Sequence, residues 1–359
     1  MKKKVLFFSC EPGGAEVLIP VIRLVRAQPG FEATVAGYGH ALKRFAGRNI
    51  ACLETHSVQE VDSFLLDSER PDLLITSATS LPEVDMSEKY LWRQARSKGI
   101  ASIAFLDQWQ NYAIRFSGPG GGGRLTYLPD WINGLNAIGC SEMISEGFDK
   151  DRLLALGHPY LSSLRSDIST LEPAGLKMQL QIPAGAKVVL FVSEPIREYY
   201  GGARGYDQYQ ALEFLLADLA KSVEKPRILV KLHPKDNAAS FRGLINKFHS
   251  LAPQLIDDDL SSLECLTVAD FVFGMSSIML IEAYVLGKSV VSLQPGLCGG
   301  DPLVLTRHGL IPLITKQNRS DLLSLGCPEA GHFDVHFDSD KFLHFLSRVI
   351  ADPHPQQGT

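Results

Sequence analysis

Two stretches in the second half of the sequence carry residue types that can bind phosphate. Residues 231–235 read Lys-Leu-His-Pro-Lys and residues 274–277 read Gly-Met-Ser-Ser, and each stretch ends an apolar run. The second leads directly into an apolar helical pattern at 278–286. If both runs are strands, an imidazole, two hydroxyls and the first amides of a helix lie at one sheet edge, where all can donate to an anion. We therefore predict a nucleotide-phosphate site there.

Each of these residues also has a purely structural explanation. Serine is a preferred helix N-cap, so Ser276 and Ser277 can serve that purpose alone. Glu282 follows on the same helix, where a carboxylate can accept hydrogen bonds from ribose hydroxyls or remain solvated. A lone histidine is most often structural, but the strand end and the rigid Pro234 favour a binding role for His233.

The apolar run 188–192 ends in the same way, at Ser193-Glu194, and we expect this pair to line the same site. Arg197 follows closely enough to contribute positive charge. The predicted nucleotide-binding residues are Ser193, Glu194, Lys231, His233, Pro234, Gly274, Ser276, Ser277 and Glu282.

The first half of the sequence supplies candidates for proton transfer. Glu11 and Asp107 each follow an apolar run, so each can place a carboxylate at the end of a strand. A carboxylate there can take the proton from an attacking hydroxyl group. We slightly prefer Asp107 as the base, with Glu11 as the alternative, and we expect His233 to stabilise the departing phosphate.

Asp107 opens a polar and aromatic cluster that can contact a sugar. Trp109 and Tyr112 can stack on a sugar ring, although aromatic residues near a helix start are more often core. Arg115 can pair with a carboxylate or phosphate of the substrate. His158, after a later strand, is as suited to packing at a domain crossover as to substrate contact.

Glycines mark two further segments. Residues 11–16 read Glu-Pro-Gly-Gly-Ala-Glu, and Gly13 and Gly14 allow close backbone approach to an acceptor or sugar, or simply a tight turn. The pattern is not GxGxxG, which disfavours a nicotinamide enzyme. Residues 118–123 hold five glycines and are a mobile loop or a lid.

Short apolar runs alternate with amphipathic ones, which is typical of parallel strands joined by helices. We predict an N-terminal Rossmann-like acceptor-side domain over 1–165, a C-terminal Rossmann-like nucleotide-sugar domain over 166–338, and a closing helix and tail over 339–359. The predicted strands are 4–9, 33–37, 73–76, 102–106, 131–137 and 153–156 in the first domain, and 188–192, 228–232, 270–273 and 289–293 in the second.

The order His233-Pro234 followed by Ser276-Ser277 resembles the HP and Ser/Thr-Ser/Thr motifs of bacterial sialyltransferases, polysialyltransferases and Kdo transferases of the GT-B fold. That resemblance implies an α/β fold of two Rossmann-like domains facing a cleft, and a CMP-sugar whose phosphate lies beside those motifs. The string 231–234 also resembles CDP-glycerol polyol-phosphate transferases. More distantly, the segment 276–288 is similar to the UDP-binding segment of UDP-N-acetylglucosamine 2-epimerases. The acidic triplet of sialyltransferases has only an imperfect counterpart, at 11–13.

Composition narrows the class of protein. A formal net charge of -5 over 359 residues gives no general cationic field, so nucleic acid is a poor candidate partner. The six cysteines show neither CxxC pairs nor a zinc-like spacing, which favours reduced thiols in the cytoplasm. No apolar run reaches the ~20 residues of a spanning helix, so we expect any membrane contact to be peripheral, at the inner face.

These features together predict a cytoplasmic glycosyltransferase that is inverting and independent of metals and cofactors. Its donor would be a CMP-activated sugar, sialic-acid-like or Kdo-like, and its acceptor a surface glycan or lipid-linked precursor. The alternatives are a UDP-sugar 2-epimerase or hydrolase of the same fold, a CDP-glycerol-type transferase, and a catalytically silent nucleotide-sugar-binding protein. The sugar, the linkage and the oligomeric state stay open.

Overall fold

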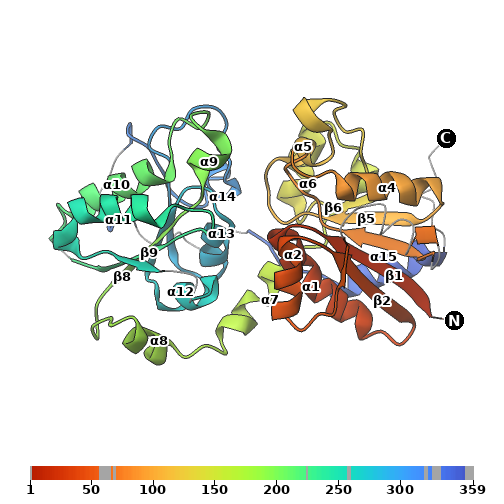
Figure 1. Ribbon diagram of the computed structural model, residues 1–359, viewed down its shortest axis with the longest axis horizontal. Coiled ribbons are helices and arrows are strands. Elements are labelled where there is room, and N and C mark those ends of the chain that lie inside the picture. The colour runs from red at the N-terminus through yellow and green to blue at the C-terminus, as the bar shows by residue number, and fades with distance from the viewer. Residues whose placement is uncertain are drawn as a thin grey trace. The chain divides into compact units, whose positions relative to one another are not determined.

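The computed structural model describes residues 2–55, 66–67, 70–223, 225–256, 260–318, 322–325 and 333–351. The chain forms two compact units (Figure 1). Unit 1 comprises Met1–Ser162 and Asp334–Thr359, and unit 2 comprises Ser163–Phe333. The predicted boundaries lay a few residues away, at 165 and 338. The final helix, α15 (Ser339–Ala351), is part of unit 1.

Unit 1 is built on a parallel sheet with the strand order β3-β2-β1-β4-β5-β6-β7. Its strands are β1 (Lys3–Ser9), β2 (Phe31–Gly37), β3 (Leu53–Glu54), β4 (Leu73–Thr76), β5 (Ala101–Phe105), β6 (Trp131–Asn133) and β7 (Leu153–Leu154). In the central register, Val5 of β1 lies opposite Ala33 on one side and Leu73 on the other. The strand order reverses between β1 and β4, which is where ligands bind in open α/β sheets.

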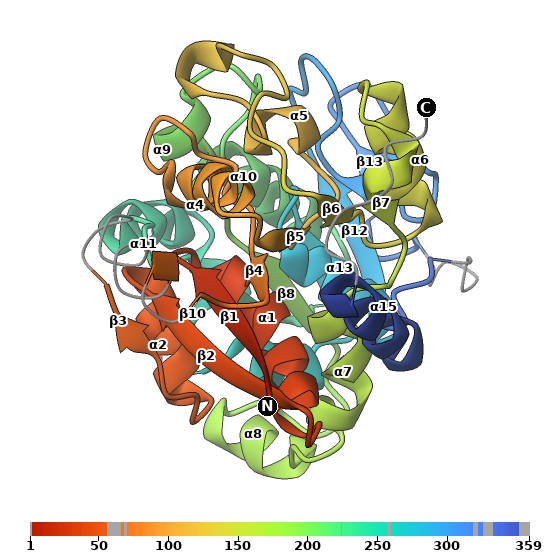
Figure 2. The same cartoon turned by 90° about the vertical axis from the view of Figure 1, so that its right-hand side faces the viewer.

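Helices cover both faces of this sheet (Figure 2). The helices in the described part of unit 1 are α1 (Pro12–Arg26), α2 (His40–Gly47), α4 (Ser87–Ser97), α5 (Tyr112–Arg115), α6 (Ala137–Ser145), the first part of α7 (Pro159–Ile168) and α15 (Ser339–Ala351). Alternate residues of the strands face opposite sides, so Val5 and Phe7 pack with α1 and α15 in one core. The apolar face of α1, which includes Val17, Leu18, Val21, Ile22 and Val25, is buried there.

Unit 2 repeats the architecture with the order β10-β9-β8-β11-β12-β13. The strands are β8 (Val188–Val192), β9 (Arg227–Lys231), β10 (Gln254–Ile256), β11 (Phe271–Gly274), β12 (Ser289–Leu293) and β13 (Leu313–Ile314). The helices are α8 (Pro173–Gln179), α9 (Ile196–Tyr200), α10 (Gln208–Leu219), α11 (Ala238–Lys247), α12 (Ser262–Val268), α13 (Ile278–Val285) and α14 (Val304–Arg307). Val189 and Phe191 of β8 pack in one core with residues of α10 and α11, and the order reverses between β8 and β11.

The fold class predicted from the sequence, two doubly wound α/β units, is confirmed. Three short strands, β3, β10 and β13, were missed. The glycine-rich segment contains a short 3-10 helix, η2 (Pro119–Gly121), and Gly118 N donates to Gly122 O at 2.8 Å. Gly120 N also donates to the Glu83 carboxylate at 2.5 Å, so the segment makes defined contacts.

The segment at 157–162, where the chain leaves unit 1, is hydrogen-bonded to the segment at 335–337, where it returns. His158 N donates to Val335 O at 3.1 Å, and Phe337 N donates to Ser162 Oγ at 3.1 Å. Gly157 has φ +90°, and a Cβ there would lie 1.7 Å from His336 O. Only glycine fits that position, because the added atom would meet rigid backbone.

Replacing Phe342 by alanine tests whether α15 completes unit 1. Phe342 is fully buried and contacts Phe105 and Phe337 at ring-centroid distances of 5.8 Å each. We expect the free energy of unfolding of unit 1 to fall by about 3–5 kcal/mol. All three tryptophans, Trp92, Trp109 and Trp131, lie in unit 1, so urea unfolding followed by tryptophan fluorescence reports on it. The exposed His344→Ala on the same helix is the control, and equal losses in the two variants would contradict the prediction.

Candidate functional site

The carboxyl edge of the unit 2 sheet is organised by a carboxylate. Glu194 follows β8, and Ser276 follows the neighbouring strand β11. Ser276 donates to Glu194 through its backbone N–H at 2.9 Å and through its hydroxyl at 2.9 and 3.0 Å. Desolvation raises the pKa of Glu194, and the hydrogen bonds from Ser276 oppose that rise. This pair sits at the point where the strand order reverses.

The two serines therefore have different roles. Both Ser276 donors are directed to Glu194, whereas Ser277 is the N-cap of α13 and accepts from Met279 N at 3.3 Å. That contact leaves the Ser277 hydroxyl hydrogen unused. The sequence pattern suggested two equivalent hydroxyls for phosphate, and of the two it is Ser277 whose hydrogen this geometry leaves for an added anion.

His233 is fixed in a turn after β9. Its backbone N–H donates to Asp236 Oδ2 at 2.8 Å, and its Nδ1 accepts from Lys235 N at 3.1 Å. A neutral imidazole that accepts at Nδ1 carries its hydrogen on Nε2. Desolvation raises the pKa of Asp236. β9 and β11 flank β8, so His233 and Ser276 follow strands about 10 Å apart.

The remaining predicted residues of unit 2 are distributed around this edge. Ser193 is buried, and its N–H donates to Lys231 O at 2.9 Å. Lys231 and Glu282 are buried, whereas Pro234 is exposed. A Cβ on Gly274 would lie 3.0 Å from Val192 O, so this glycine lets β11 approach β8 closely.

Polar residues that the sequence did not single out join the same edge. Gln294, fully buried after β12, accepts from the Tyr206 hydroxyl at 3.0 Å and donates to Asp301 at 3.0 Å. Gln208 donates to Glu198 at 2.7 Å and to Asp236 at 3.3 Å. Glutamines inside helical or loop patterns carry no sequence signal for such a role.

The Arg197 side chain contacts other residues of unit 2. Its guanidinium forms an ion pair with Asp207 at 2.5 Å and lies over the Tyr209 ring at 4.4 Å. Arg204 lies over Tyr200 at 4.3 Å, and Lys235 lies over Tyr199 at 4.9 Å. These three cations are held in place by tyrosine faces at this end of unit 2.

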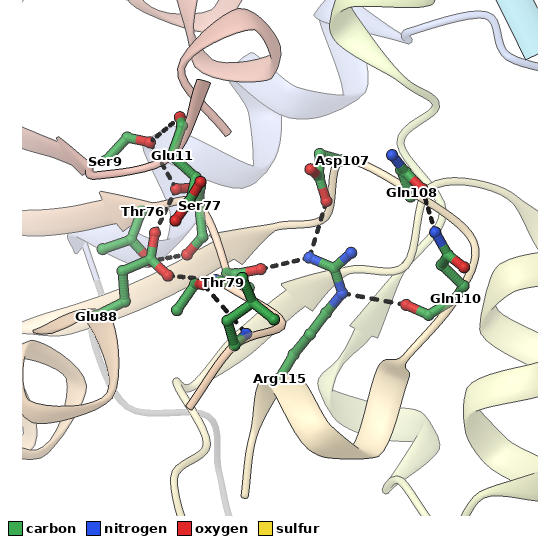
Figure 3. A network of polar contacts seen from close by, with 12 residues as sticks. Ser9, Glu11, Thr76, Ser77, Thr79, Glu88, Asp107, Gln108, Gln110 and Arg115 are labelled. Atoms are coloured by element: carbon green, nitrogen blue, oxygen red, sulfur yellow. Dashed lines mark hydrogen bonds and ion pairs between the residues drawn. The ribbon is translucent and has the colours of Figure 1, made fainter. Parts of the chain in front are cut away.

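At the carboxyl edge of unit 1, Asp107 is held between a guanidinium and a helix start. Arg115 Nη1 lies 2.8 Å from Asp107 Oδ1, and the Arg115 side chain is only 4% exposed (Figure 3). A Cβ on Gly13 would lie 2.5 Å from Asp107 Oδ2, so the carboxylate packs against the first turn of α1. Arg115 was expected to bind substrate, but it orients Asp107 and also donates to Ala78 O and Gln110 O.

Two aromatic candidates of unit 1 are core residues. Trp109 is 1% exposed, stacks on His158 with ring centroids 5.4 Å apart, and donates to Asn136 Oδ1 at 2.9 Å. Tyr112 is 2% exposed and donates to Glu142 at 2.6 Å. The Trp109 ring face is thus occupied by protein, as the core interpretation of these aromatics predicts.

His158 supports the turn that carries Asp107. Its Nδ1 accepts from Leu161 N at 3.3 Å, so Nε2 carries the hydrogen and donates to Asp107 O at 3.0 Å. Burial lowers the pKa of His158 to about 4, with the contacts to Asp107 acting in the opposite direction. His158 is therefore a neutral residue that fixes the Asp107 backbone.

Glu88 of α4 is a buried carboxyl group that sequence inspection missed. Its Oε2 accepts from Thr79 N at 2.5 Å, and its Oε1 contacts the Ser77 hydroxyl. Desolvation raises the pKa of Glu88 to about 7, against the effect of both hydrogen bonds. Ser77 in turn lies under α1, since a Cβ on Gly14 would approach Ser77 Oγ to 2.3 Å. Glu11 is the N-cap residue of α1 and makes no side-chain cap bond.

Two features are absent from the described residues. Within them, no group of three or more His, Cys, Asp or Glu side chains could hold a metal ion. None of the helices in that part of the chain is long and apolar enough to cross a membrane.

The fold is shared with solved structures of nucleotide-sugar enzymes. UDP-GlcNAc 2-epimerase from Neisseria meningitidis, bound to UDP-GlcNAc, is 14% identical with a TM-score of 0.66 over 97% of this chain and 100% of that one. Staphylococcus aureus MnaA with UDP is 12% identical with a TM-score of 0.69 over 98% and 97%. A glycosyltransferase from Rickettsia africae is 12% identical with a TM-score of 0.64 over 98% and 99%.

No protein-family model and no curated protein matches the sequence. The structural matches establish that the chain has the GT-B fold, which the sequence resemblance predicted.

Glu88 and His158, two buried titrating groups of unit 1, should affect stability in opposite directions. The pKa of Glu88 rises from 4.5 to about 7 on folding, so its contribution is lost as pH rises through that window. The pKa of His158 falls from 6.5 to about 4, so its contribution is lost as pH falls through a similar window. Each effect amounts to about 3 kcal/mol over its full window.

We therefore expect the unfolding free energy of the wild type to vary little between pH 5 and 7 from these two groups. In Glu88→Gln it should increase with pH, and in His158→Gln it should decrease with pH. Urea titrations at several pH values, monitored by tryptophan fluorescence, measure the slopes. Parallel slopes in the two variants would refute the assignment of these groups.

Proposed function

We propose that this protein is a nucleotide-sugar enzyme that binds a UDP-sugar at the carboxyl edge of unit 2 and breaks its anomeric C–O bond, as a 2-epimerase or hydrolase. Two observations support the donor class. The edge of the second sheet gathers donors where the strand order reverses, and two of the similar structures contain UDP or UDP-GlcNAc. The single observation that carries the proposal is the arrangement around β8, with His233 on one side and Ser276-Ser277 on the other.

The chemistry requires stabilisation of a leaving phosphate. When the C1–O bond breaks, its electrons remain on the departing nucleotide, and negative charge grows on the phosphate oxygens. The Nε2–H of His233, the Ser277 hydroxyl and the first amides of α13 are donors of the kind that this charge needs. Glu194 holds Ser276 and thereby the turn before α13 in place.

Asp107 is proposed as the group that moves a proton. Epimerisation at C2 of the sugar breaks and remakes the C2–H bond, and hydrolysis deprotonates an attacking water. Both reactions therefore use a base. Arg115 and the close approach of Gly13 hold the Asp107 carboxylate in one orientation. We prefer Asp107 to Glu11, because Arg115 orients the Asp107 carboxylate and His158 fixes the Asp107 backbone carbonyl.

A second candidate is transfer from a CMP-activated sugar to a glycan or lipid-linked acceptor. It is favoured by the sequence motifs themselves, since His233-Pro234 and Ser276-Ser277 follow the two strands that flank β8. A CDP-glycerol-type transfer would use the same edge.

Nucleotide binding separates these candidates. We expect UDP to raise the melting temperature more than CMP, CDP or GDP, because a ligand that binds only the folded state stabilises it. His233→Ala should reduce the shift with UDP, and the exposed His249→Ala should leave it unchanged. Incubation with UDP-N-acetylglucosamine alone should then release UDP or yield the 2-epimer. Preferential stabilisation by CMP or CDP would favour the transferase, and no shift with any nucleotide would reject both.

Variants of Asp107 and Gly13 test the proton-transfer role separately. Asp107→Asn should lower kcat by roughly 10²-fold or more, because an amide cannot take the proton. Gly13→Ala should also lower kcat, since its Cβ would displace the Asp107 carboxylate. Gly47→Ala is the control and should leave kcat unchanged, because a Cβ at Gly47 meets nothing within 4 Å. The UDP-induced thermal shift should persist in all three variants. Unchanged kcat in Asp107→Asn would remove Asp107 from the reaction.

A further inference from the structure

A chain of hydroxyl groups connects the buried carboxyl group of Glu88 to the start of α1. Glu88 Oε1 contacts Ser77 Oγ, Ser77 Oγ lies 2.8 Å from Ser9 Oγ, and Ser9 Oγ donates to Glu11 O at 3.2 Å (Figure 3). Glu11 is the N-cap residue of α1. Glu88 and Ser9 are both fully buried, so water does not replace these partners.

The number of hydroxyl hydrogens decides which group donates in each hydrogen bond of this chain. Each serine hydroxyl has one hydrogen to donate. If Ser9 donates to Glu11 O, its contact with Ser77 requires Ser77 to donate to Ser9. Glu88 must then be a carboxylic acid that donates to Ser77. If Glu88 is ionised, Ser77 donates to Glu88, Ser9 donates to Ser77, and Glu11 O loses its hydrogen bond from Ser9.

A second route connects Glu88 with Asp107. Thr79 N donates to Glu88 Oε2 at 2.5 Å, and the preceding residue, Ala78, accepts from Arg115 Nη1 through its carbonyl. The same Arg115 nitrogen pairs with Asp107 Oδ1 at 2.8 Å. Glu88 thus holds both the loop that anchors Arg115 and, through Ser77 and Ser9, the first turn of α1.

Both routes meet at the Asp107 carboxylate. Its Oδ1 faces Arg115, and its Oδ2 faces Gly13 in the first turn of α1. We propose that Glu88 is the positioning residue of Asp107, and that the proton on Glu88 sets whether the hydroxyl chain to Glu11 is complete. The functional part of this inference rests on the proposed role of Asp107, whereas the structural part does not.

The charged groups around Glu88 come from several elements. Lys89 of α4 favours its ionised form, and Asp85 before α4 opposes it. Cys10 at the end of β1 and Tyr38 after β2 both interact with Asp85 and stay protonated, because burial raises the pKa of each. The positive charge of Arg115 contributes to lowering the pKa of Lys89, after the larger effect of burial. Since burial raises the pKa of Glu88 to about 7, its proton is exchanged near neutral pH.

Glycine amide signals test the inference without substrate. In ¹⁵N-glycine-labelled protein, we expect the NMR signals of Gly13 and Gly14 to shift with pH, with a midpoint at about 7. Glu88→Gln always donates through its amide to Ser77, so it should hold both signals at their low-pH positions at every pH. The exposed Glu32→Gln on β2 is the matched control and should titrate like the wild type.

Ser9→Ala provides a second variant that keeps Glu88 and Ser77. It removes the last link of the hydroxyl chain but keeps the route through Arg115, so the pH response of Gly13 should be smaller than in the wild type. If these signals titrate in Glu88→Gln or in Ser9→Ala as they do in the wild type, the inference is wrong.

Enzyme kinetics give an independent readout. If UDP-sugar turnover is found, the kcat profile of the wild type should change near pH 7, and Glu88→Gln should remove that change without altering KM. A kcat profile that keeps this change in Glu88→Gln would overturn the positioning role. Absence of turnover with every nucleotide sugar would overturn the proposed function, while the glycine titration decides the Glu88 inference by itself.

Discussion

In both units a glutamate satisfies the polar groups at the point where the strand order reverses. Glu88 accepts from the Thr79 amide and contacts the Ser77 hydroxyl beside β4. Glu194 accepts from the amide and the hydroxyl of Ser276 beside β11. Buried amides and hydroxyls without partners would destabilise these turns. The same physical solution therefore fixes the loop at the switch point of each sheet.

This arrangement places carboxyl groups where an anionic ligand is proposed to bind in unit 2. An ionised Glu194 would repel a phosphate, but its hydrogen bonds from Ser276 spread that charge over the turn, and Arg204 favours the same ionised form. Nearby cations on tyrosine faces supply the opposite charge. The edge is therefore electrostatically mixed, and recognition depends on directed donors more than on net charge.

The sequence predicted the elements whose signals are local. The strands 73–76, 188–192 and 289–293 match the structure residue for residue, because each is a buried apolar run with abrupt ends. The edge strands β3, β10 and β13 have two or three residues each and carry no such pattern. Their pairing is decided by the neighbouring strand.

Side-chain roles were harder to predict than strands, because they depend on contacts distant in sequence. Arg115 and Trp109 have the chemistry of ligand-binding residues. Only the folded chain shows that Arg115 pairs with Asp107 and that Trp109 stacks on His158. Glu88 resembles any glutamate of an amphipathic helix until Ser77 and Thr79 are placed beside it. The sequence predicted that His233 and Ser276 lie at one edge of the sheet, since the carboxyl ends of parallel strands share an edge.

The discontinuity of unit 1 has a consequence for biosynthesis. Phe342, Phe345, Leu346 and Val349 of α15 pack in the same core as the buried residues of α1, yet they follow the whole of unit 2 in the sequence. Unit 2 is continuous and can fold on the ribosome as soon as it has emerged. Until α15 arrives, the nascent N-terminal half exposes an apolar face that chaperones can bind. Unit 2 can therefore complete its fold during translation before unit 1 does.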